Sequence, residues 1–519
     1  MTTRSASPPT TTATALAGII AGGFGLAVAE MVAAASPRWR SPVLDVGDRV
    51  IDRVPSALKD LAIAWFGTND KVALLVGIGL VLGALAAAAG VAFLRSGRRR
   101  PTAGAILVVG LVGGAAAVFG RTGASVTAAA PSLVGATAVV GTLTVFDQAA
   151  GRPAHQRRPG PTMAHPPTRR RFLASMAVVG GAAAVVAATG RRLADRFSAT
   201  DSRAAVRLPA PVSPAAPLPD GVQAEGAASF VTSNADFYRI DTALTVPQVP
   251  TQGWRLRVHG LVDRPFELDF DELLDRGLIE RDITLTCVSN TIGGELVGNA
   301  RWLGVRLDEL LDEAGVQPQA DQIIGRSVDG YTCGFPTAAL DGRDAMVAVG
   351  MNGEPLPLAH GFPARLVVPG LYGYVSATKW LSEIELTTFA DVDHYWVPRG
   401  YAAEAPIKLM SRIDRPRGLD RIPPGPFVIA GVAWAQTVGI AAVEVRIDGG
   451  DWLETDIAAS AGADSWRQWS LPWEATPGRH QVEVRAFDAA GAIQTDERSE
   501  PLPDGASGHH TIVVLVDDA

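Results

Sequence analysis

Long apolar stretches separated by short polar segments occupy roughly the first two hundred residues of this 519-residue chain. A helix needs about 20 apolar residues to cross the hydrocarbon of a bilayer, and glycine and alanine allow such helices to pack closely. We therefore expect an α-helical membrane domain over residues 1–200. Its five predicted transmembrane helices cover residues 13–35, 72–94, 102–120, 126–146 and 172–189.

Arginine clusters predict the orientation of this membrane domain. Basic residues collect in segments 95–100 and 151–171, and such segments stay in the cytoplasm. The N-terminus is then inside, and the chain after the fifth span lies outside the cytoplasmic membrane. The segment 168–173, Thr-Arg-Arg-Arg-Phe-Leu, resembles a twin-arginine signal, which exports proteins already folded around a cofactor. A plain positive-inside anchor is the alternative.

The pattern changes after residue 200. An Ala/Pro-rich segment at 201–226 predicts an extended, semi-rigid linker. Residues 254–258 and 266–270 then alternate between apolar and polar, as half-buried strands do, and short helices are expected from 271 and 305. Strands and helices mix without a regular βαβ repeat, so we expect an α+β domain over 227–400.

Regularly spaced short strands predict a separate domain over residues 401–519. The runs 441–447, 480–486 and 511–515 alternate, and Asp448-Gly449-Gly450 marks a hairpin turn. Such spacing is typical of an all-β, immunoglobulin-like sandwich.

Composition narrows the function classes. The net charge is −7 and 47% of the residues are hydrophobic, and no basic face accompanies the later domains, which argues against nucleic acid as a partner. Two cysteines make neither a covalent haem motif nor a four-cysteine set, and no histidine falls inside a predicted span. We therefore expect neither haem nor an iron–sulfur cluster in this chain.

Cys287 is the first candidate for chemistry. It ends the β-type run 283–287 and opens a polar loop containing Gly293 and Gly294. A thiol at a strand end is a candidate metal ligand or nucleophile. A disulfide with Cys333 is the alternative in an oxidising compartment; otherwise Cys333 is expected to be a structural, buried thiol.

A second unusual string supports the metal-ligand interpretation. It reads His-Gly-Phe-Pro-Ala-Arg at 360–365 and leads into Ala-Thr-Lys-Trp-Leu at 377–381. With the Cys287 segment it resembles the sulfite oxidase family, whose members bind molybdenum through a pyranopterin dithiolene. The resemblance covers roughly residues 225–519. With its predicted membrane domain, the chain is similar to a membrane-anchored, actinobacterial-type member of the family.

The resemblance implies a molybdenum–molybdopterin cofactor. A soft thiolate suits the metal, and cations suit the terminal phosphate of the pterin. Cys287 would be the metal ligand, and the catalytic set would be Cys287, Arg239 and Tyr401. The implied cofactor-binding residues are Phe237, Tyr238, Arg239, Cys287, Asp329, His360, Arg365, Thr378 and Lys379.

The chain departs from the family pattern at one point. Sulfite-oxidising members carry two arginines shortly after the cysteine, where this chain has Thr291 and Ile292. The substrate therefore stays open between a sulfite-like oxyanion and a sulfur or nitrogen oxide. With no haem domain expected, electrons would pass to a separate partner or to a quinone at the lipid membrane. The family's sandwich domain mediates dimerisation, which implies a homodimer.

The expected function is a membrane-anchored molybdenum-cofactor oxidoreductase on the outer face of the cytoplasmic membrane, acting by oxygen-atom or two-electron transfer. One alternative is a non-enzymatic, membrane-anchored binding protein with a degenerate cofactor domain. Another is a cysteine hydrolase with Cys287 as nucleophile and His360 as base.

Overall fold

The structure is a computed structural model that describes residues 9–36, 39–53, 65, 70–120, 125–150 and 169–518. The chain forms two compact units. The first comprises Met1–Ser198 with Ala243–Thr245, and the second comprises Ala199–Thr242 with Val246–Ala519.

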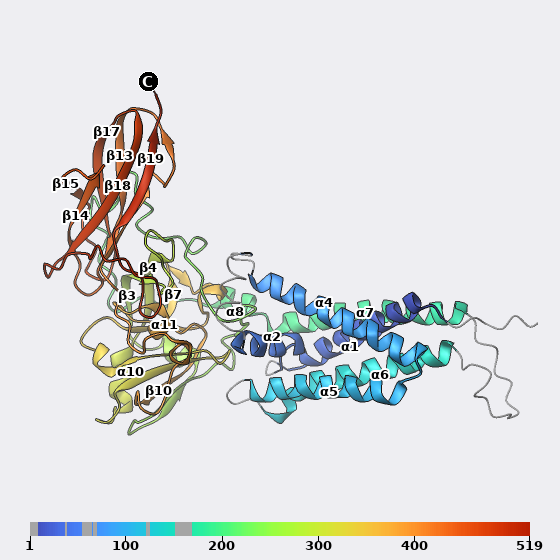
Figure 1. Ribbon diagram of the computed structural model, residues 1–519. Helices are drawn as coiled ribbons and strands as arrows, with labels where there is room; N and C mark the ends of the chain where they lie inside the picture. The colour runs from blue at the N-terminus through green and yellow to red at the C-terminus, as the bar shows by residue number, and fades with distance from the viewer. Residues whose placement is uncertain are drawn as a thin grey trace, which may run out of the picture. The chain divides into compact units, whose positions relative to one another are not determined.

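Five helices of the first unit are long and apolar enough to cross a membrane (Figure 1). Each of the five apolar stretches lies on one of them. The helical elements of this unit are α1 (Thr11–Ala33), α2 (Pro42–Arg53), α4 (Asp70–Gly90), η2 (Val91–Arg95), α5 (Arg99–Phe119), η3 (Val126–Ala129), α6 (Ala130–Ala150), α7 (Arg169–Ala194) and η5 (Asp195–Phe197). Of the twin-arginine-like motif, Thr168 lies outside the described residues and the rest begins α7.

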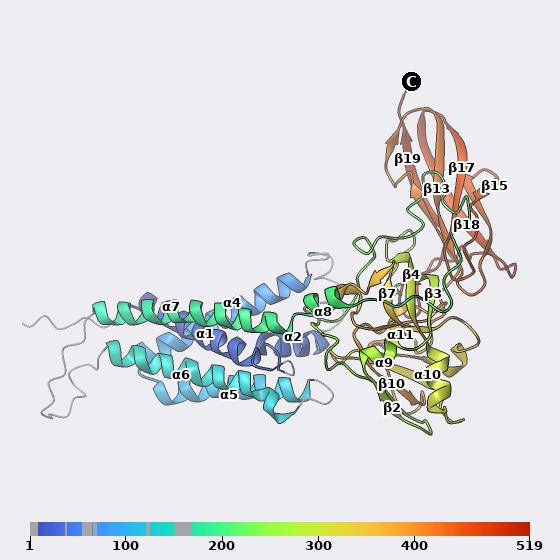
Figure 2. The ribbon, with the colours of Figure 1, turned by 180° about the vertical axis from the view of Figure 1, so that it is seen from behind.

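Helix α1 is the centre of this bundle and packs against α4, α6 and α7, as both ribbon views show (Figures 1 and 2). Small side chains allow the close approach. Gly18 of α1 faces Gly90 of α4, and a Cβ placed on Gly18 would lie 2.1 Å from the carbonyl oxygen of Ala86. The buried cluster of the bundle consists of Ala17, Ala21, Phe93, Leu143, Phe146, Phe172 and Met176.

The second unit begins with α8 (Ala199–Ala205) and the segment expected to be a linker. The segment is extended after α8, but it packs along the domain that follows. Ser213 pairs with Ile279 in a parallel bridge, and Leu208 packs against the domain core. The apolar residues between the prolines bury their side chains against this domain. The Ala/Pro-rich composition, from which a linker was predicted, gives no sign of this packing.

One mixed sheet, one antiparallel sheet and short helices build the α+β domain. One sheet has the order β2-β1-β10-β5-β6, and the other has the order β3-β4-β7-β8 with β9 beside β7. The strands are β1 (Leu256–Gly260), β2 (Phe266–Leu268), β3 (Leu278–Thr286), β4 (Val297–Arg306), β5 (Gln322–Ser327), β6 (Thr332–Pro336), β7 (Met346–Met351), β8 (Glu354–Pro355), β9 (Arg365–Val367) and β10 (Leu381–Thr387). The helices are α9 (Phe270–Leu274), α10 (Leu307–Ala314), η6 (Thr337–Ala339), η7 (Leu358–His360), α11 (Gly373–Ser376) and η8 (Val397–Arg399).

Two facing sheets form the C-terminal sandwich. Their orders are β11-β13-β17-β16 and β12-β19-β18-β14-β15. The predicted hairpin is confirmed, since Arg446 of β14 pairs with Trp452 of β15. The strands are β11 (Met410–Arg415), β12 (Arg421–Ile422), β13 (Gly425–Trp434), β14 (Ile440–Ile447), β15 (Trp452–Glu454), β16 (Asp456–Ile457), β17 (Arg467–Ala475), β18 (Gly478–Asp488) and β19 (His510–Val516). Its immunoglobulin-like character and the homodimer stay predictions.

The glycine contact in the bundle gives a stability prediction. Gly18→Val forces α1 and α4 apart, and overpacking of this kind costs about 1–3 kcal/mol. Gly23→Val is the matched control, because no atom lies within 4 Å of a Cβ at Gly23 and the helix-propensity change is the same. We expect thermal unfolding of the detergent-solubilised protein to shift down for Gly18→Val relative to Gly23→Val. Equal shifts would contradict the packing argument.

Candidate cofactor and active site

Cys287 follows strand β3 directly and begins a closed loop. Its backbone N–H donates to the carbonyl of Leu296 at 2.9 Å, and the side-chain oxygen of Asn290 accepts from the N–H of Leu296. The thiol is 7% exposed, and burial raises its pKa, while hydrogen bonds from Ser289 and the charge of Lys379 lower it. The neighbouring hydroxyl of Thr286 is buried and has no hydrogen-bond partner among the described residues.

Two backbone segments bring the cations together. Residues 364–366 run beside 378–381, with the N–H of Leu366 donating to Thr378 and that of Leu381 to Ala364. Gly361 has a φ of 110°, and a Cβ there would lie 3.1 Å from the Cα of Lys379. Glycine is therefore required where His360, Arg365 and Lys379 converge.

Arg365 is a buried cation without a carboxylate partner among the described residues. It is 5% exposed; one guanidinium N–H donates to the carbonyl of His360 at 3.1 Å, and the group lies 5.0 Å from the ring centroid of Trp302. Burial lowers its pKa to about 10. A charge held this way favours binding of an anion from outside the protein chain.

Lys379 and Arg239 share one carboxylate. The ammonium of Lys379 lies 2.9 Å from Asp241, whose side chain is 4% exposed, and Arg239 lies 2.7 Å from the same carboxylate. Burial lowers the pKa of Lys379 to about 8, against the opposing effect of Asp241. Asp241 was not among the site residues predicted from the sequence. Its position two residues after the predicted Arg239 was the one signal that could have identified it.

Aromatic residues form one wall. Phe237 stacks on Tyr238 at 5.2 Å between ring centroids and meets Trp302 and His360 edge-on at 5.7 and 5.6 Å. Burial raises the pKa of Tyr238, and the Cys287 thiol raises it further while Arg365 lowers it. These residues lie within electrostatic reach of one another. We call Tyr238, Arg239, Asp241, Cys287, His360, Arg365 and Lys379 the thiol–cation cluster.

Three predicted site residues lie in other surroundings. The hydroxyl of Thr378 is buried, 2.6 Å from the sulfur of Cys333, and donates to the carbonyl of Gly325. Asp329 caps the turn between β5 and β6, where it accepts from the N–H of Tyr331. Tyr401 packs in an aromatic group, 5.2 Å from Trp396 between ring centroids.

The disulfide alternative from the sequence is wrong. Both cysteines are free thiols, so no disulfide joins Cys287 to Cys333. The cysteine-hydrolase interpretation gains no support, because no hydrogen bond joins His360 to Cys287 among the described residues and Nε2 of His360 lies 3.0 Å from the carbonyl of Asn234. Burial and Arg365 lower the pKa of His360 to about 4.

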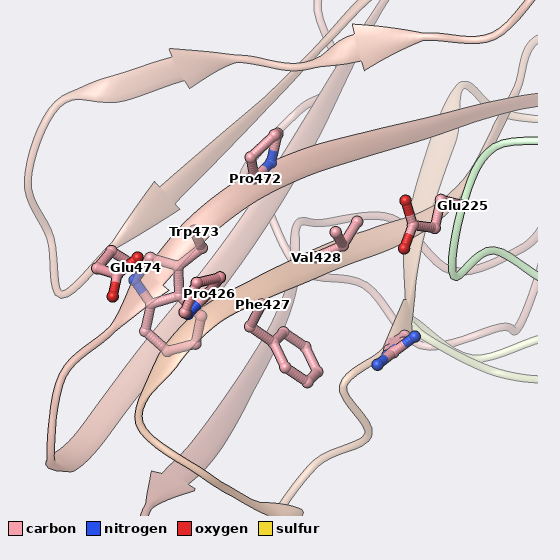
Figure 3. A pocket seen from close by; sticks show the side chains of 8 residues that line it. Glu225, Pro426, Phe427, Val428, Pro472, Trp473 and Glu474 are labelled. Atoms are coloured by element: carbon pink, nitrogen blue, oxygen red, sulfur yellow. The ribbon is translucent and has the colours of Figure 1, made fainter.

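A hollow of about 440 Å³ lies elsewhere, on strands β13 and β17 of the sandwich (Figure 3). It shares no residue with the thiol–cation cluster. Its lining residues are Glu225, Arg415, Pro426, Phe427, Val428, Pro472, Trp473 and Glu474. None of these is a thiol, a histidine or a lysine, so the hollow offers no counterpart to the chemistry of the cluster.

Comparisons with known proteins identify the domain that holds most of the thiol–cation cluster. The family described as "Oxidoreductase molybdopterin binding domain" matches residues 243–396. Human mitochondrial sulfite oxidase is 28% identical over 318 residues, which cover 52% of this chain and 58% of that protein. The "Uncharacterized oxidoreductase YuiH" of Bacillus subtilis (strain 168) is 35% identical over 148 residues, covering 28% of this chain and 72% of that protein.

Among solved structures, the sulfane dehydrogenase SoxCD of Paracoccus pantotrophus is similar at a TM-score of 0.49 and 24% identity, covering 56% of this chain and 84% of that chain. The chain spans less than two thirds of the human sulfite oxidase that it matches. It belongs to the sulfite oxidase family of molybdopterin-dependent oxidoreductases, and it contains the family's molybdopterin-binding domain.

The chain's own residues fit this cofactor. The buried guanidinium of Arg365 has no carboxylate partner among the residues that the structure describes, and a pterin phosphate would neutralise it. The soft thiol of Cys287 suits molybdenum. The buried, unpaired hydroxyl of Thr286 beside it has hydrogen-bonding capacity that a bound group would use.

The shared carboxylate gives a prediction about charge. Asp241→Asn removes the anion that stabilises the ammonium of Lys379, so the pKa of Lys379 falls below its value of about 8. We expect the pH midpoint for acylation of Lys379, followed by peptide mass spectrometry, to move down by about one pH unit. Asp236→Asn is the control, because Asp236 bonds to Ser233 outside the cluster. An unchanged midpoint in Asp241→Asn would refute the assignment.

Proposed function

We propose that this protein is a membrane-anchored molybdenum oxidoreductase that exchanges an oxygen atom with a small oxide or oxyanion, while an electron pair passes in the opposite direction. The observation that carries the proposal is the buried guanidinium of Arg365, which has no carboxylate partner among the described residues, together with the buried thiol of Cys287, since both act electrostatically on Tyr238. Molybdopterin supplies the two-electron chemistry when bound.

The charges of the thiol–cation cluster suggest a role for each of its residues. Cys287 would ligate molybdenum, and His360, Arg365 and Lys379 would hold the pterin phosphate. The imidazole of His360 donates its Nε2–H to the carbonyl of Asn234, so it would have to be protonated on Nδ1 to donate to the phosphate as well. The stacked pair Phe237 and Tyr238 would wall the site.

The remaining predicted residues have weaker support. Asp329 stays a proposed cofactor contact, and Tyr401 stays a proposed substrate contact. Thr378 would contribute through its backbone, because its hydroxyl is engaged by Cys333 and Gly325.

A neutral oxide is the substrate class that we favour over sulfite. Arg239 is the cation implied to face the substrate, and it shares the carboxylate of Asp241, 2.7 Å away, with Lys379. Ile292, which stands where sulfite-oxidising members have an arginine, packs its side chain toward the sandwich instead. A pocket whose arginine already has a carboxylate partner binds a dianion such as sulfite more weakly than a pocket with unpaired arginines.

The helical bundle would anchor the enzyme on the outer face of the cytoplasmic membrane. Five helices meet the length and apolarity of a membrane span, and Arg95, Arg98, Arg99 and Arg100 lie between the second and third of them, where positive charge favours the cytoplasm. The motif at the start of α7 would direct export of the folded domain. A separate redox protein or a membrane quinone would exchange electrons with the site.

Replacing Arg365 separates function from stability. In Arg365→Met a buried cation without a carboxylate partner becomes an apolar side chain of similar length, so the cofactor-free fold should be as stable or more stable. The phosphate site loses its most buried charge, and we expect the molybdenum and pterin content to fall about tenfold or more. Metal analysis and pterin fluorescence measure the content, and thermal unfolding measures the stability.

Arg326→Met is the matched control, because Arg326 pairs with Glu385 away from the cluster. It should keep the cofactor. Full cofactor content in Arg365→Met would refute the phosphate role. Absence of molybdenum from the wild-type protein, produced in cells that make molybdopterin, would leave the non-enzymatic binding protein as the better account.

A further inference from the structure

The loop that carries Cys287 has few contacts of its own at its tip. We call residues 287–296 the cysteine loop. Its neck is closed by the Cys287–Leu296 backbone bond and by Asn290. At the tip, the N–H of Gly294 donates to the carbonyl of Thr291. Glycines at a loop tip leave the backbone mobile unless another element holds it.

Arg412 of strand β11 holds the tip from the sandwich side. Its guanidinium donates to the carbonyl of Gly294 at 2.9 Å. The same group is fixed by Asp414 at 2.6 Å, and the two side chains are 10% and 11% exposed. A buried, charge-assisted donor with its own carboxylate is stiffer than a surface arginine.

His510, the first residue of β19, closes the other side of the tip. Gly293 has a φ of 75°, and a Cβ at this position would lie 2.2 Å from Nε2 of His510, so the ring lies directly against the loop backbone. The ring is oriented by its Nδ1, which accepts from the N–H of Ile413 at 3.0 Å. No side chain larger than glycine fits between this ring and the loop.

The strand that leads into the cysteine loop is held by the same sandwich. The N–H of Thr284 donates to the carbonyl of Asp464 at 2.9 Å, and its hydroxyl accepts from the N–H of Trp466 at 2.7 Å. The side-chain amide of Gln436 donates to the carbonyl of Thr284 at 3.1 Å. Strand and loop on both sides of Cys287 are thus bonded to the C-terminal domain.

We propose that the sandwich domain positions Cys287, with Arg412 and His510 as the positioning residues that fix the cysteine loop. The functional meaning of this proposal rests on the proposed role of Cys287 as metal ligand, whereas the contacts themselves do not. Arg412 and His510 act through the loop backbone and touch neither substrate nor metal in this account. The sandwich then has a role in the site that is independent of any dimer contact.

The two cysteines allow a test that needs no cofactor. The full-length protein, purified in detergent from cells that cannot make molybdopterin, is treated with iodoacetamide, and the labelling rates of Cys287 and Cys333 are followed by peptide mass spectrometry. Cys333 is fully buried in β6 and reports general unfolding. In Arg412→Ala we expect Cys287 to label about tenfold faster, because a charge-assisted bond to the loop is lost, while Cys333 stays at its wild-type rate.

Three further variants sharpen the test. His510→Ala should raise the rate at Cys287 selectively as well, and Arg412→Lys should restore part of the protection, since lysine keeps one charged donor. Arg417→Ala is the control, because Arg417 is exposed in the turn after β11, and it should label as the wild type does.

The proposal is overturned if Cys287 in Arg412→Ala and His510→Ala labels at the wild-type rate. It is also overturned if both thiols accelerate together, because the sandwich then supports only global stability. A failure of the proposed function would be seen in a different measurement, the molybdenum content. Wild-type protein without molybdenum would remove the metal role of Cys287 and leave the labelling result intact.

Discussion

The site centres on a buried positive charge that has no carboxylate partner in the part of the chain that the structure describes. Arg365 carries a guanidinium into the interior, where its partners are backbone carbonyls and the ring of Trp302. An isolated buried charge costs several kcal/mol, and a fold keeps it only when something else offsets the cost. An anionic cofactor would offset it, and the chemistry of the proposed site would then be linked to the stability of the loaded protein.

The basic residues near Arg365 differ in how far their charge is neutralised. Lys379 and Arg239 share the buried carboxylate of Asp241, and burial leaves His360 neutral. The cluster therefore carries less positive charge than a count of its basic residues suggests. Under the proposed function, Arg365 and Lys379 would supply the donors that a phosphate needs, and the carboxylate beside Arg239 would favour a neutral oxide over sulfite.

Patterns along the chain predicted the elements better than the contacts. The length of the apolar stretches predicts the five helices, because the thickness of a bilayer sets the length of a helix that spans it. The alternation around Asp448 predicts the β14–β15 hairpin, because the paired residues are close in sequence. Asp241 as a shared carboxylate and the turn of the Thr378 hydroxyl toward Cys333 depend on segments far apart in sequence. No periodicity encodes such contacts, and the same is true of the packing of segment 201–226 along the second unit.

The most direct test of the central claim is X-ray absorption at the molybdenum edge of the loaded full-length protein, wild type beside Cys287→Ser. If Cys287 is the protein ligand, the variant should keep its pterin, held through Arg365 and Lys379, and show one sulfur neighbour fewer around the metal. An identical sulfur shell in both proteins would contradict the account, because the thiol of Cys287 would then not reach the metal.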